Sequence, residues 1–278
     1  MRSQRLKRWR TADRWPATSW ADTRVSTVRL TGITLAPTGW SAIACPVCGG
    51  GAFKKLFSKE QQDFVECNGC GLVMVNPRPS FEEIAAIYAS DYSGRYIAKK
   101  ASKARRARRR IAQMQKYQSE GCWLDIGCSA GFILDAAQQA GYETYGVDLD
   151  PTGLKYARDN FGIEHLYEGP LESHHLAPGS FDVITLYDVI EHVLDLHSIV
   201  AELKRILAPA GTLEIWTPDV SHWSRTRPLD EWKAVMPYKH LYYFNAKTLR
   251  RLLATHDLKI VKQPFMLKAG LRVYVQHA

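Results

Sequence analysis

The chain has 278 residues, 46% of them hydrophobic, and a formal net charge of +9. This length supports one full hydrophobic core and a small additional module. No uninterrupted apolar run reaches the ~18 residues of a transmembrane helix, and no apolar stretch of a secretory signal follows the basic N-terminus, so we expect a cytoplasmic protein without a membrane span.

The positive charge is concentrated in two segments. Residues 1–40 hold eight Lys and Arg against two acids, and residues 95–110 hold nine basic residues and no acid. The remainder holds 20 basic and 26 acidic residues. The basic character therefore belongs to these two segments, and the overall charge is weak support for nucleic-acid binding.

Residues 1–40 show no sustained period and are expected to form a disordered basic tail. Residues 41–80 contain two C-x-x-C knuckles, each followed by glycine, a spacing that suits a tetrahedral Zn²⁺. Disulfides and a redox pair are the alternatives. The predicted zinc ligands are Cys45, Cys48, Cys67 and Cys70. Cys122 and Cys128 are expected to pack rather than to bind metal.

Residues 81–118 are expected to form a helical linker. Ser80 and Glu83 stand at the capping-box positions of "SFEEIAAIYAS". The following basic stretch has sparse apolar residues, so we expect a solvated helix that packs on one narrow side. A charged linker is favoured over a helix that contacts phosphates.

Residues 119–278 alternate apolar strand-like and amphipathic helix-like segments, which predicts a mostly parallel α/β sheet with helices on both faces. Strands are expected at 122–126, 143–147, 164–168, 181–186 and 211–217, and helices at 131–140, 151–161, 195–207 and 246–255. The segments "LKIVKQP" and "LRVYVQHA" are expected to form a terminal antiparallel pair.

The stretch "GCWLDIGCSAG" (121–131) leads from a strand into a helix through small residues, the shape of a nucleotide-cofactor loop. With "YGVDLDP", "FDVITLYDVIEHV" and "LKRILAPAGTLEIWTP" in the same order, it resembles the class I S-adenosylmethionine-dependent methyltransferases. The Cys₄ segment resembles the zinc ribbon of a bacterial small-molecule subgroup. The resemblance implies a Rossmann-like seven-stranded sheet. A dehydrogenase is the competing interpretation, but the loop lacks the phosphate-binding G-x-G-x-x-G pattern.

The resemblance also implies a cofactor site. The glycines would let the backbone approach the cofactor, Asp125 would orient the loop and the cofactor's ammonium group, and Asp148 would accept both ribose hydroxyls. Pro170 replaces the acid that the family often shows beside the adenine. The expected cofactor-binding residues are Asp125, Gly127, Cys128, Ser129, Gly131, Asp148, Leu149, Leu171, Glu172, Leu186 and Tyr187.

The segment "LYDVIEHV" follows the fourth strand of this domain. Similar D/E-x-x-E-H elements of ubiquinone-pathway O-methyltransferases are linked to a divalent metal, which implies a possible ion near Asp188, Glu191 and His192. Hydrogen bonds that fix the loop are the favoured alternative. His192 is also a candidate general base, because an unperturbed imidazole titrates near neutrality.

Residues 218–245 are aromatic and polar and too long for a simple connection, so we expect a lid over the substrate. Within it, "KHLYYFNAKTL" resembles the family's H-L-x-x-F element. His240 and Tyr242 are therefore further candidates for substrate contact or proton acceptance, whereas His222 has no such support.

The resemblance thus predicts methyl transfer to an oxygen or carbon, or to a nitrogen, of a small-molecule acceptor in specialised or cell-envelope metabolism. Two alternatives remain open. One is an RNA methyltransferase that grips phosphates with the Arg-rich helix and the ribbon, and the other is a non-catalytic binding protein on the same fold. The sequence does not predict the oligomeric state.

Overall fold

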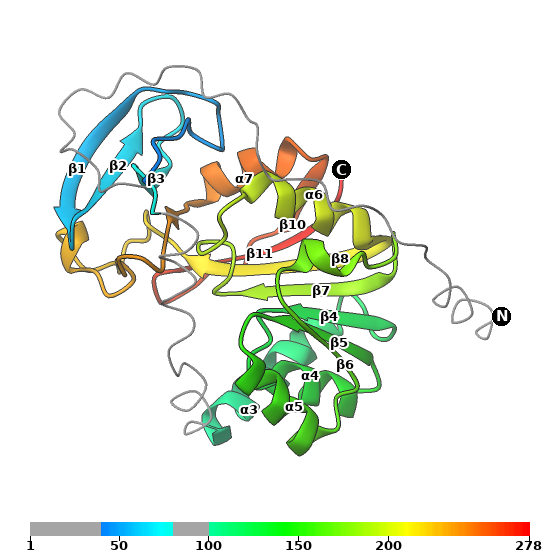
Figure 1. Cartoon of the computed structure of the whole chain (residues 1–278). Helices are drawn as coiled ribbons and strands as arrows, with labels where there is room; N and C mark the ends of the chain where they lie inside the picture. The colour runs from blue at the N-terminus through cyan, green and yellow to red at the C-terminus, as the bar shows by residue number, and fades with distance from the viewer. Residues whose placement is uncertain (1–39, 80–99) are drawn as a thin grey trace.

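A computed structural model describes residues 40–79 and 100–278 (Figure 1). The expected basic tail, apart from Trp40, and the expected cap at Ser80 and Glu83 lie outside the described residues. Within the described residues, no helix is long and apolar enough to cross a membrane.

The larger sheet has seven strands in the order β10-β11-β8-β7-β4-β5-β6. Strands β6, β5, β4, β7 and β8 are parallel, and β11 pairs antiparallel with both β8 and β10. This confirms the predicted mostly parallel sheet and the terminal antiparallel pair. The strands are β4 (Cys122–Ile126), β5 (Glu143–Asp148), β6 (His165–Glu168), β7 (Phe181–Tyr187), β8 (Leu207–Pro218), β10 (Leu258–Lys262) and β11 (Gly270–His277).

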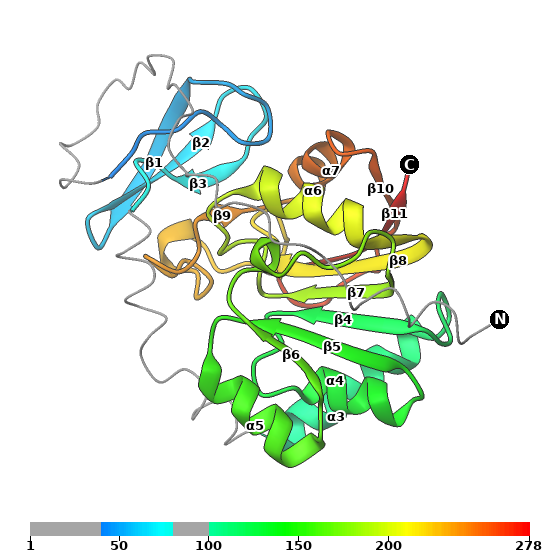
Figure 2. The same ribbon diagram turned by 45° about the vertical axis from the view of Figure 1, so that its right-hand side comes forward.

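Helices cover both faces of this sheet (Figures 1 and 2). One face carries α3, α4 and α5, whose apolar residues share one core cluster, and the other carries α6 and α7. The helices are α3 (Lys100–Met114), α4 (Phe132–Gln139), α5 (Pro151–Phe161), α6 (Leu196–Ile206) and α7 (Ala246–Ala254), with short 3₁₀ turns η3 (Leu171–His174) and η4 (Leu229–Glu231). The predicted helices and strands match within a few residues; β8 begins earlier than expected, directly after α6.

Side-chain caps fix where these helices begin. Asp150 accepts a hydrogen bond from the Thr152 amide ahead of α5, and Asp195 accepts from two amides of α6. Asn245 and Thr248 form a reciprocal capping box at α7. Such caps satisfy amides that have no partner within the helix, typically worth about 1 kcal/mol each.

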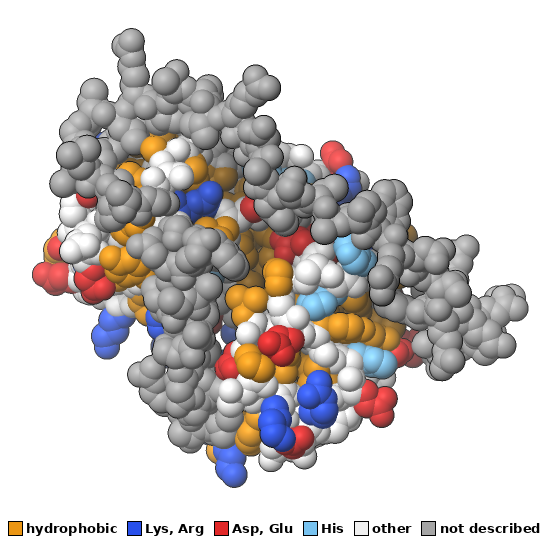
Figure 3. Space-filling view, viewed as in Figure 1, with side chains coloured by type: hydrophobic (Ala, Val, Ile, Leu, Met, Phe, Trp, Pro, Cys, Tyr) orange, Lys and Arg blue, Asp and Glu red, His pale blue; other side chains and the backbone are white. Residues whose placement is uncertain are grey.

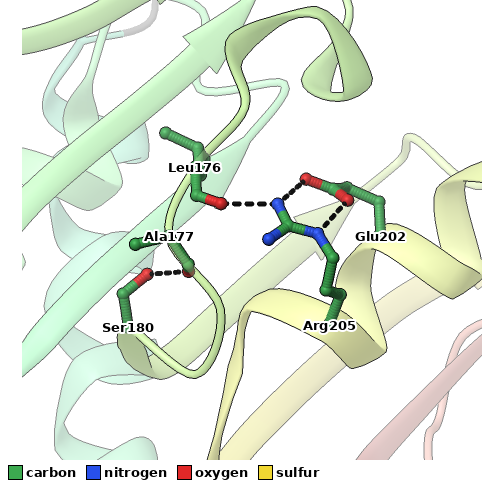
Figure 4. A network of polar contacts seen from close by, with 5 residues as sticks. All are labelled: Leu176, Ala177, Ser180, Glu202 and Arg205. Carbon is green, nitrogen blue, oxygen red and sulfur yellow. Dashed lines mark hydrogen bonds and ion pairs between the residues drawn. The ribbon is translucent and has the colours of Figure 1, made fainter. Parts of the chain in front are cut away.

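Arg205 ties the C-terminal turn of α6 to the loop before β7 (Figure 4). Its guanidinium forms a two-point ion pair with Glu202 and also donates to the Leu176 carbonyl. In the same loop, the Ser180 hydroxyl donates to the Ala177 carbonyl over 2.6 Å. These contacts fix the path of the chain into β7, whose far end carries the candidate site.

A second sheet has four strands in the order β1-β2-β3-β9. Three come from the Cys-rich segment, namely β1 (Phe53–Lys59), β2 (Gln62–Cys67) and β3 (Val73–Val75). The fourth, β9 (Tyr242–Tyr243), comes from the segment expected to be a lid, and it lies beside β3 in Figure 2. The Cys-rich segment and the 218–245 segment therefore build one sheet.

A separate apolar cluster joins the same two segments. Phe64, Val73 and Val75 of the four-stranded sheet pack with Val220 and Trp232 of the late segment. In the space-filling view, hydrophobic side chains gather in the recess between this sheet and the larger domain (Figure 3). Because the side chains of the apolar cluster are buried away from water, the cluster holds the 218–245 segment in place.

Candidate active site

The loop from Gly127 to Gly131 connects β4 to α4 at the carboxyl end of the sheet. Gly127, Ser129 and Gly131 all have positive φ, of 70°, 47° and 75°. A Cβ on Gly131 would lie 2.6 Å from the Ala157 Cβ of α5, and one on Gly127 would lie 2.5 Å from Val189 Cγ2. The two glycines are thus required by backbone conformation and by packing inside the protein.

Asp148, the last residue of β5, holds this loop. Its Oδ2 accepts a hydrogen bond from the Ser129 amide over 2.7 Å, and its Oδ1 accepts from the Asp150 amide over 2.8 Å. Burial raises the pKa of its carboxyl group. A carboxylate has about four acceptor positions, so Asp148 retains capacity for further donors.

Asp125 is buried at the end of β4 and accepts a hydrogen bond from the Thr185 hydroxyl over 2.6 Å. Burial raises the pKa of Asp125 to about 7, and Arg110 of α3 opposes this rise. The Arg110 guanidinium carbon lies 3.6 Å from the centre of the Tyr187 ring. A cation at this distance over an aromatic face is attracted to it. Sequence reasoning did not single out Arg110 within its basic run.

Two buried hydroxyl groups beside the loop have no hydrogen-bond partner among the described residues. They belong to Ser129 and Tyr187. An unpaired buried polar group is costly, so such groups commonly mark where a ligand or water binds. These two hydroxyl groups could therefore form hydrogen bonds with the polar groups of a cofactor bound at this edge of the sheet.

The remaining expected cofactor residues divide between surface and core. Leu149 is 55% exposed directly after β5, whereas Cys128, Leu171 and Leu186 are buried. Glu172 is half-buried; burial raises the pKa of its carboxyl group, and a hydrogen bond from Ser198 of α6 lowers it. The Glu172 carboxylate is therefore engaged with α6.

A buried polar cluster lies between the end of β7 and the 218–245 segment. It contains Glu191, His192 and His240, whose potential ligand atoms all lie within 4.8 Å of one another. The two imidazole rings meet edge to face with centres 4.6 Å apart. Glu191 Oε2 accepts from the Thr217 hydroxyl over 3.0 Å, while Glu191 Oε1 and His240 Nδ1 have no partner among the described residues. The cluster brings together His192 and His240, which stand in separate sequence motifs.

Main-chain carbonyls orient both imidazoles. His192 Nδ1 lies 2.7 Å from the Lys239 carbonyl, and the His240 ring hydrogen-bonds the Ala234 carbonyl. Because a carbonyl only accepts, the ring nitrogen facing it carries the proton and the other nitrogen carries the lone pair. Burial lowers the pKa of His192 to about 4 and that of His240 to about 3, so both rings are neutral at pH 7.

The carboxyl group of Glu191 belongs to this cluster, whereas that of Asp188 lies outside it. Burial raises the pKa of Glu191 to about 8. Asp188 has φ of 58°, and its carboxyl group is not among the clustered ligand atoms. Burial raises the pKa of Asp188 to about 6, against the attraction of Arg110, Lys103 and Arg106. Of the expected metal group, Glu191 and His192 lie together with His240, whereas Asp188 is outside this cluster; the metal itself stays a prediction.

Tyr242 has a different position from the one expected for a catalytic hydroxyl. Its side chain is 1% exposed, and its hydroxyl accepts a hydrogen bond from Arg78 over 2.6 Å and donates to the Leu194 carbonyl over 3.2 Å. The first bond connects Tyr242 to the end of the Cys-rich segment, and the second connects it to the loop between β7 and α6. His222 hydrogen-bonds the Met266 carbonyl, away from the cluster.

The four knuckle cysteines converge. Cys45 Sγ lies 3.5 Å from Cys70 Sγ, and Cys48 Sγ lies 3.4 Å from Cys67 Sγ. All four thiols are free, and the sulfurs lie within 4.8 Å of one another. Four sulfurs about 2.3 Å from a tetrahedral Zn²⁺ stand roughly 3.8 Å apart. The donor set therefore fits one zinc ion and contains no disulfide.

Both glycines that follow the knuckles adopt the predicted turn. Gly49 has φ of 73° and Gly71 has φ of 80°. The amides of these two residues bond back to the carbonyls of Cys45 and Cys67. Each knuckle is thus a tight turn that places two thiols on the same side.

The sheet order and the loop beyond β4 define a class I S-adenosylmethionine-dependent methyltransferase fold. The chain belongs to the methyltransferase-domain family, whose model matches residues 96–263. This confirms the resemblance inferred from the sequence.

Two curated relatives cover parts of the chain. A ubiquinone biosynthesis O-methyltransferase of Thiobacillus denitrificans is 37% identical over 98 residues, which is 32% of this chain and 40% of that protein. A probable S-adenosylmethionine-dependent methyltransferase of Mycolicibacterium smegmatis is 29% identical over 139 residues, covering 49% of this chain and 51% of that protein. The chain thus spans about two fifths to one half of these relatives.

Solved structures share the fold. The mitomycin 7-O-methyltransferase MmcR is 15% identical with a TM-score of 0.55, covering 70% of this chain and 60% of MmcR. An S-adenosylmethionine-dependent methyltransferase from Mesorhizobium loti is 17% identical with a TM-score of 0.52, covering 61% and 96%. At these identities the similarity concerns the architecture.

Proposed function

We propose that this protein transfers a methyl group from S-adenosylmethionine to an oxygen or carbon, or to a nitrogen, of a small molecule, in specialised or cell-envelope metabolism. The observation that carries the proposal is the loop that Asp148 holds beside the unpaired hydroxyls of Ser129 and Tyr187. This arrangement lies at the carboxyl edge of a parallel sheet, where α/β folds bind their ligands.

The loop and its neighbours supply a group for each charged or polar part of the cofactor. Asp148 would accept the ribose hydroxyls, and Asp125 would attract the ammonium group. Arg110, held over Tyr187, would attract the carboxylate. The exposed Leu149 offers an apolar surface for the adenine. Cys128, Leu171 and Leu186, which are buried, would support these groups by packing.

S-Adenosylmethionine supplies a methyl group on a positively charged sulfur, which an aligned nucleophile displaces in line. The protein then has to orient the acceptor and take a proton from a hydroxyl or an acidic carbon. Neutral His240 and His192 each direct a lone pair away from the carbonyl that orients them. His240 is our first candidate base, because its Nδ1 is buried without a partner among the described residues.

Labelled S-adenosylmethionine incubated with pools of candidate acceptors tests the proposal. We expect transfer by the parent protein and a loss of 10²–10⁴-fold in His240→Gln, with unchanged affinity for S-adenosylhomocysteine. His197→Gln, an exposed histidine on α6, is the matched control. Equal activity in His240→Gln and the parent would exclude His240 as the base. Failure of the parent to bind S-adenosylhomocysteine would favour a non-catalytic protein on the same fold.

We also propose that Cys45, Cys48, Cys67 and Cys70 hold a structural Zn²⁺. The support is the convergence of four free thiols at distances suited to one tetrahedral ion. A closed Cys₄ site has no open position for substrate, so the ion would stabilise the fold rather than act on the acceptor.

The Glu191, His192 and His240 cluster supports a second, divalent metal as an alternative to a base. Two imidazoles and one carboxylate are a common donor set for Zn²⁺ and Fe²⁺, and carbonyl bonds to the opposite ring nitrogens are typical of metal-binding histidines. Metal analysis distinguishes the roles. One ion per chain, lost in Cys67→Ser, supports a metal-free cluster, whereas a second ion lost in His240→Gln supports a metal site.

A further inference from the structure

Three buried side chains form a hydrogen-bonded chain that ends at Asp125. Trp123 and Asp125 stand two residues apart on β4, so both side chains are on the same face of the sheet. The neighbouring parallel strand β7 places Thr185 opposite Asp125. The Trp123 indole Nε1 lies 3.1 Å from the Thr185 hydroxyl oxygen, which lies 2.6 Å from Asp125 Oδ1. The chain of hydrogen bonds thus runs from the interior of the sheet to the residue two positions before Gly127.

The indole fixes the direction of hydrogen bonding along this chain. An indole N–H can only donate, so the Thr185 oxygen accepts from Trp123 and keeps its own proton for another group. Two acceptors are near this proton. Asp125 Oδ1 lies at 2.6 Å, a distance typical of a hydroxyl that donates to a carboxylate, whereas the Leu124 carbonyl lies at 3.4 Å, which is long for a hydroxyl donor. The Thr185 proton therefore points to Asp125.

The surroundings of Asp125 act both for and against its negative charge. The titratable groups that interact electrostatically with it are Arg110 on α3, Cys128 in the loop after β4, Asp148 on β5, Tyr187 on β7 and Glu214 on β8. Burial raises the pKa of Cys128 and Tyr187, so these two groups carry no charge at pH 7. Burial raises the pKa of Asp125, and the charges of Asp148 and Glu214 raise it further. The hydrogen bond from Thr185 acts with the charge of Arg110 in the opposite direction.

We propose that Thr185 and Trp123 are positioning residues for the methyl donor: they direct a hydroxyl proton to Asp125 and hold a carboxylate there for the ammonium group of the cofactor. This inference rests on the proposed methyl transfer. Donation by Trp123 polarises the Thr185 hydroxyl and strengthens its bond to Asp125, because hydrogen bonds in a chain reinforce one another. A carboxylate that is already ionised does not have to release a proton when the cofactor binds. Cofactor affinity near neutral pH should therefore depend on a hydroxyl group that acts through Asp125.

Thr185→Val removes this hydroxyl and keeps the shape of the side chain. The measurement is calorimetric titration of S-adenosylhomocysteine into the full-length, zinc-replete protein between pH 5 and pH 8.5. We expect the pH midpoint of affinity to rise by about one unit, so that binding is about tenfold weaker at pH 6 and within about twofold of the parent at pH 8.5. Thr185→Ser keeps the hydroxyl and should have the midpoint of the parent. Trp123→Phe should shift the midpoint in the same direction by a smaller amount.

Thr212→Val is the matched control. Thr212 is a buried threonine on β8 of the same sheet, and its oxygen accepts from Gln276 Nε2 over 3.2 Å. Its replacement should leave the midpoint unchanged. A second measurement needs no ligand: ¹³C NMR follows the carboxyl carbon of Asp125, assigned by its loss in Asp125→Asn. This carbon should titrate at a higher pH in Thr185→Val than in the parent.

Three outcomes would overturn the inference. One is an unchanged midpoint in Thr185→Val. Another is weakening by the same factor at every pH, which indicates general damage to the site. The third is an equal shift in Thr212→Val, which indicates an unspecific effect of a lost hydroxyl. Failure of the parent to bind S-adenosylhomocysteine would overturn the proposed function, and the NMR titration would then still decide whether Thr185 controls the ionisation of Asp125.

Discussion

Arg78 Nη1 donates a hydrogen bond to the Tyr242 hydroxyl over 2.6 Å, joining residues 164 positions apart. Arg78 also donates to the Leu194 carbonyl, beyond the Glu191 and His192 loop. Two residues before Tyr242 stands His240, and the Leu241 amide bonds to the Glu191 carbonyl over 2.8 Å. Arg78, at the end of the Cys-rich segment, thus bonds to residues that lie two positions after each part of the candidate catalytic cluster, Leu194 after His192 and Tyr242 after His240.

The Tyr242 hydroxyl is expected to stabilise the fold and not to take part in proton transfer. Tyr242→Phe should lower the free energy of unfolding by about 1–2 kcal/mol, because Arg78 loses one acceptor but keeps the Leu194 carbonyl. Urea unfolding measures this loss, and methyl transfer should persist. A fall in kcat of a hundredfold with unchanged stability would contradict this and return the hydroxyl to the catalytic site.

Removal of one zinc ligand should affect the His240 segment as well as the Cys-rich segment. In Cys67→Ser we expect loss of the bound metal and faster proteolysis of residues 218–245, because β3 pairs with β9. Affinity for S-adenosylhomocysteine should remain, since Asp125 and Asp148 lie on β4 and β5 of the other sheet.

Metal analysis, limited proteolysis and calorimetry check this zinc-ligand prediction. Cys122→Ser is the control, because Cys122 begins β4 and lies outside the thiol cluster. Full metal content in Cys67→Ser would refute ligation by four thiolates. Unchanged proteolysis of 218–245 in metal-free protein would show that the two segments are independent.

Asp125 should make cofactor affinity depend on pH. Its pKa is raised from 3.8 to about 7 by burial, so the ligand-free fold loses stability as pH rises from about 4 through 7. A bound ammonium group favours the ionised carboxylate. Affinity for S-adenosylhomocysteine should therefore rise with pH, by at most about tenfold per unit, and level off above pH 7.

Asp125→Asn, which keeps the shape and cannot ionise, is the comparison for this pH dependence. Calorimetry from pH 5 to pH 8 should show that the variant binds S-adenosylhomocysteine more weakly and with nearly the same affinity at every pH. The free energy of unfolding of the variant should not decrease between pH 4 and pH 7 as that of the parent does. The same pH dependence in the variant and the parent would assign it to another group, with Asp148 the next carboxyl group to test.

Gly131 has a positive φ and also a close neighbour at the position where a Cβ would lie. Gly141 has a positive φ but no such neighbour, so comparing alanine variants of the two glycines separates backbone strain from steric contact. Gly131→Ala brings a Cβ to 2.6 Å from the Ala157 Cβ, whereas Gly141 has φ of 94° and no atom within 4 Å of the added Cβ. Gly141→Ala should cost about 1–2 kcal/mol from conformation alone. Gly131→Ala should cost more in thermal unfolding and weaken S-adenosylhomocysteine binding. Equal losses in the two variants would show that α5 moves away without cost.

Much of the fold could be predicted because its signals are local. Apolar periodicity and caps such as Asp150 and Asn245 act within a few residues, so the strands and helices of the larger domain were predicted within a few positions. The pairing of β3 with β9 could not be predicted, because the sequence around Tyr242 and Tyr243 is equally compatible with a lid. Their short strand forms only where the Cys-rich segment offers an edge to pair with.

The candidate site divides in the same way. Short sequence spacings were enough to predict the loop from Gly127 to Gly131 and the grouping of the four thiols. Only the tertiary structure brought His240 to Glu191 and His192 and placed Arg110 over Tyr187. These contacts join distant segments through shared burial, and burial also sets the charge states of the groups, which no local pattern encodes.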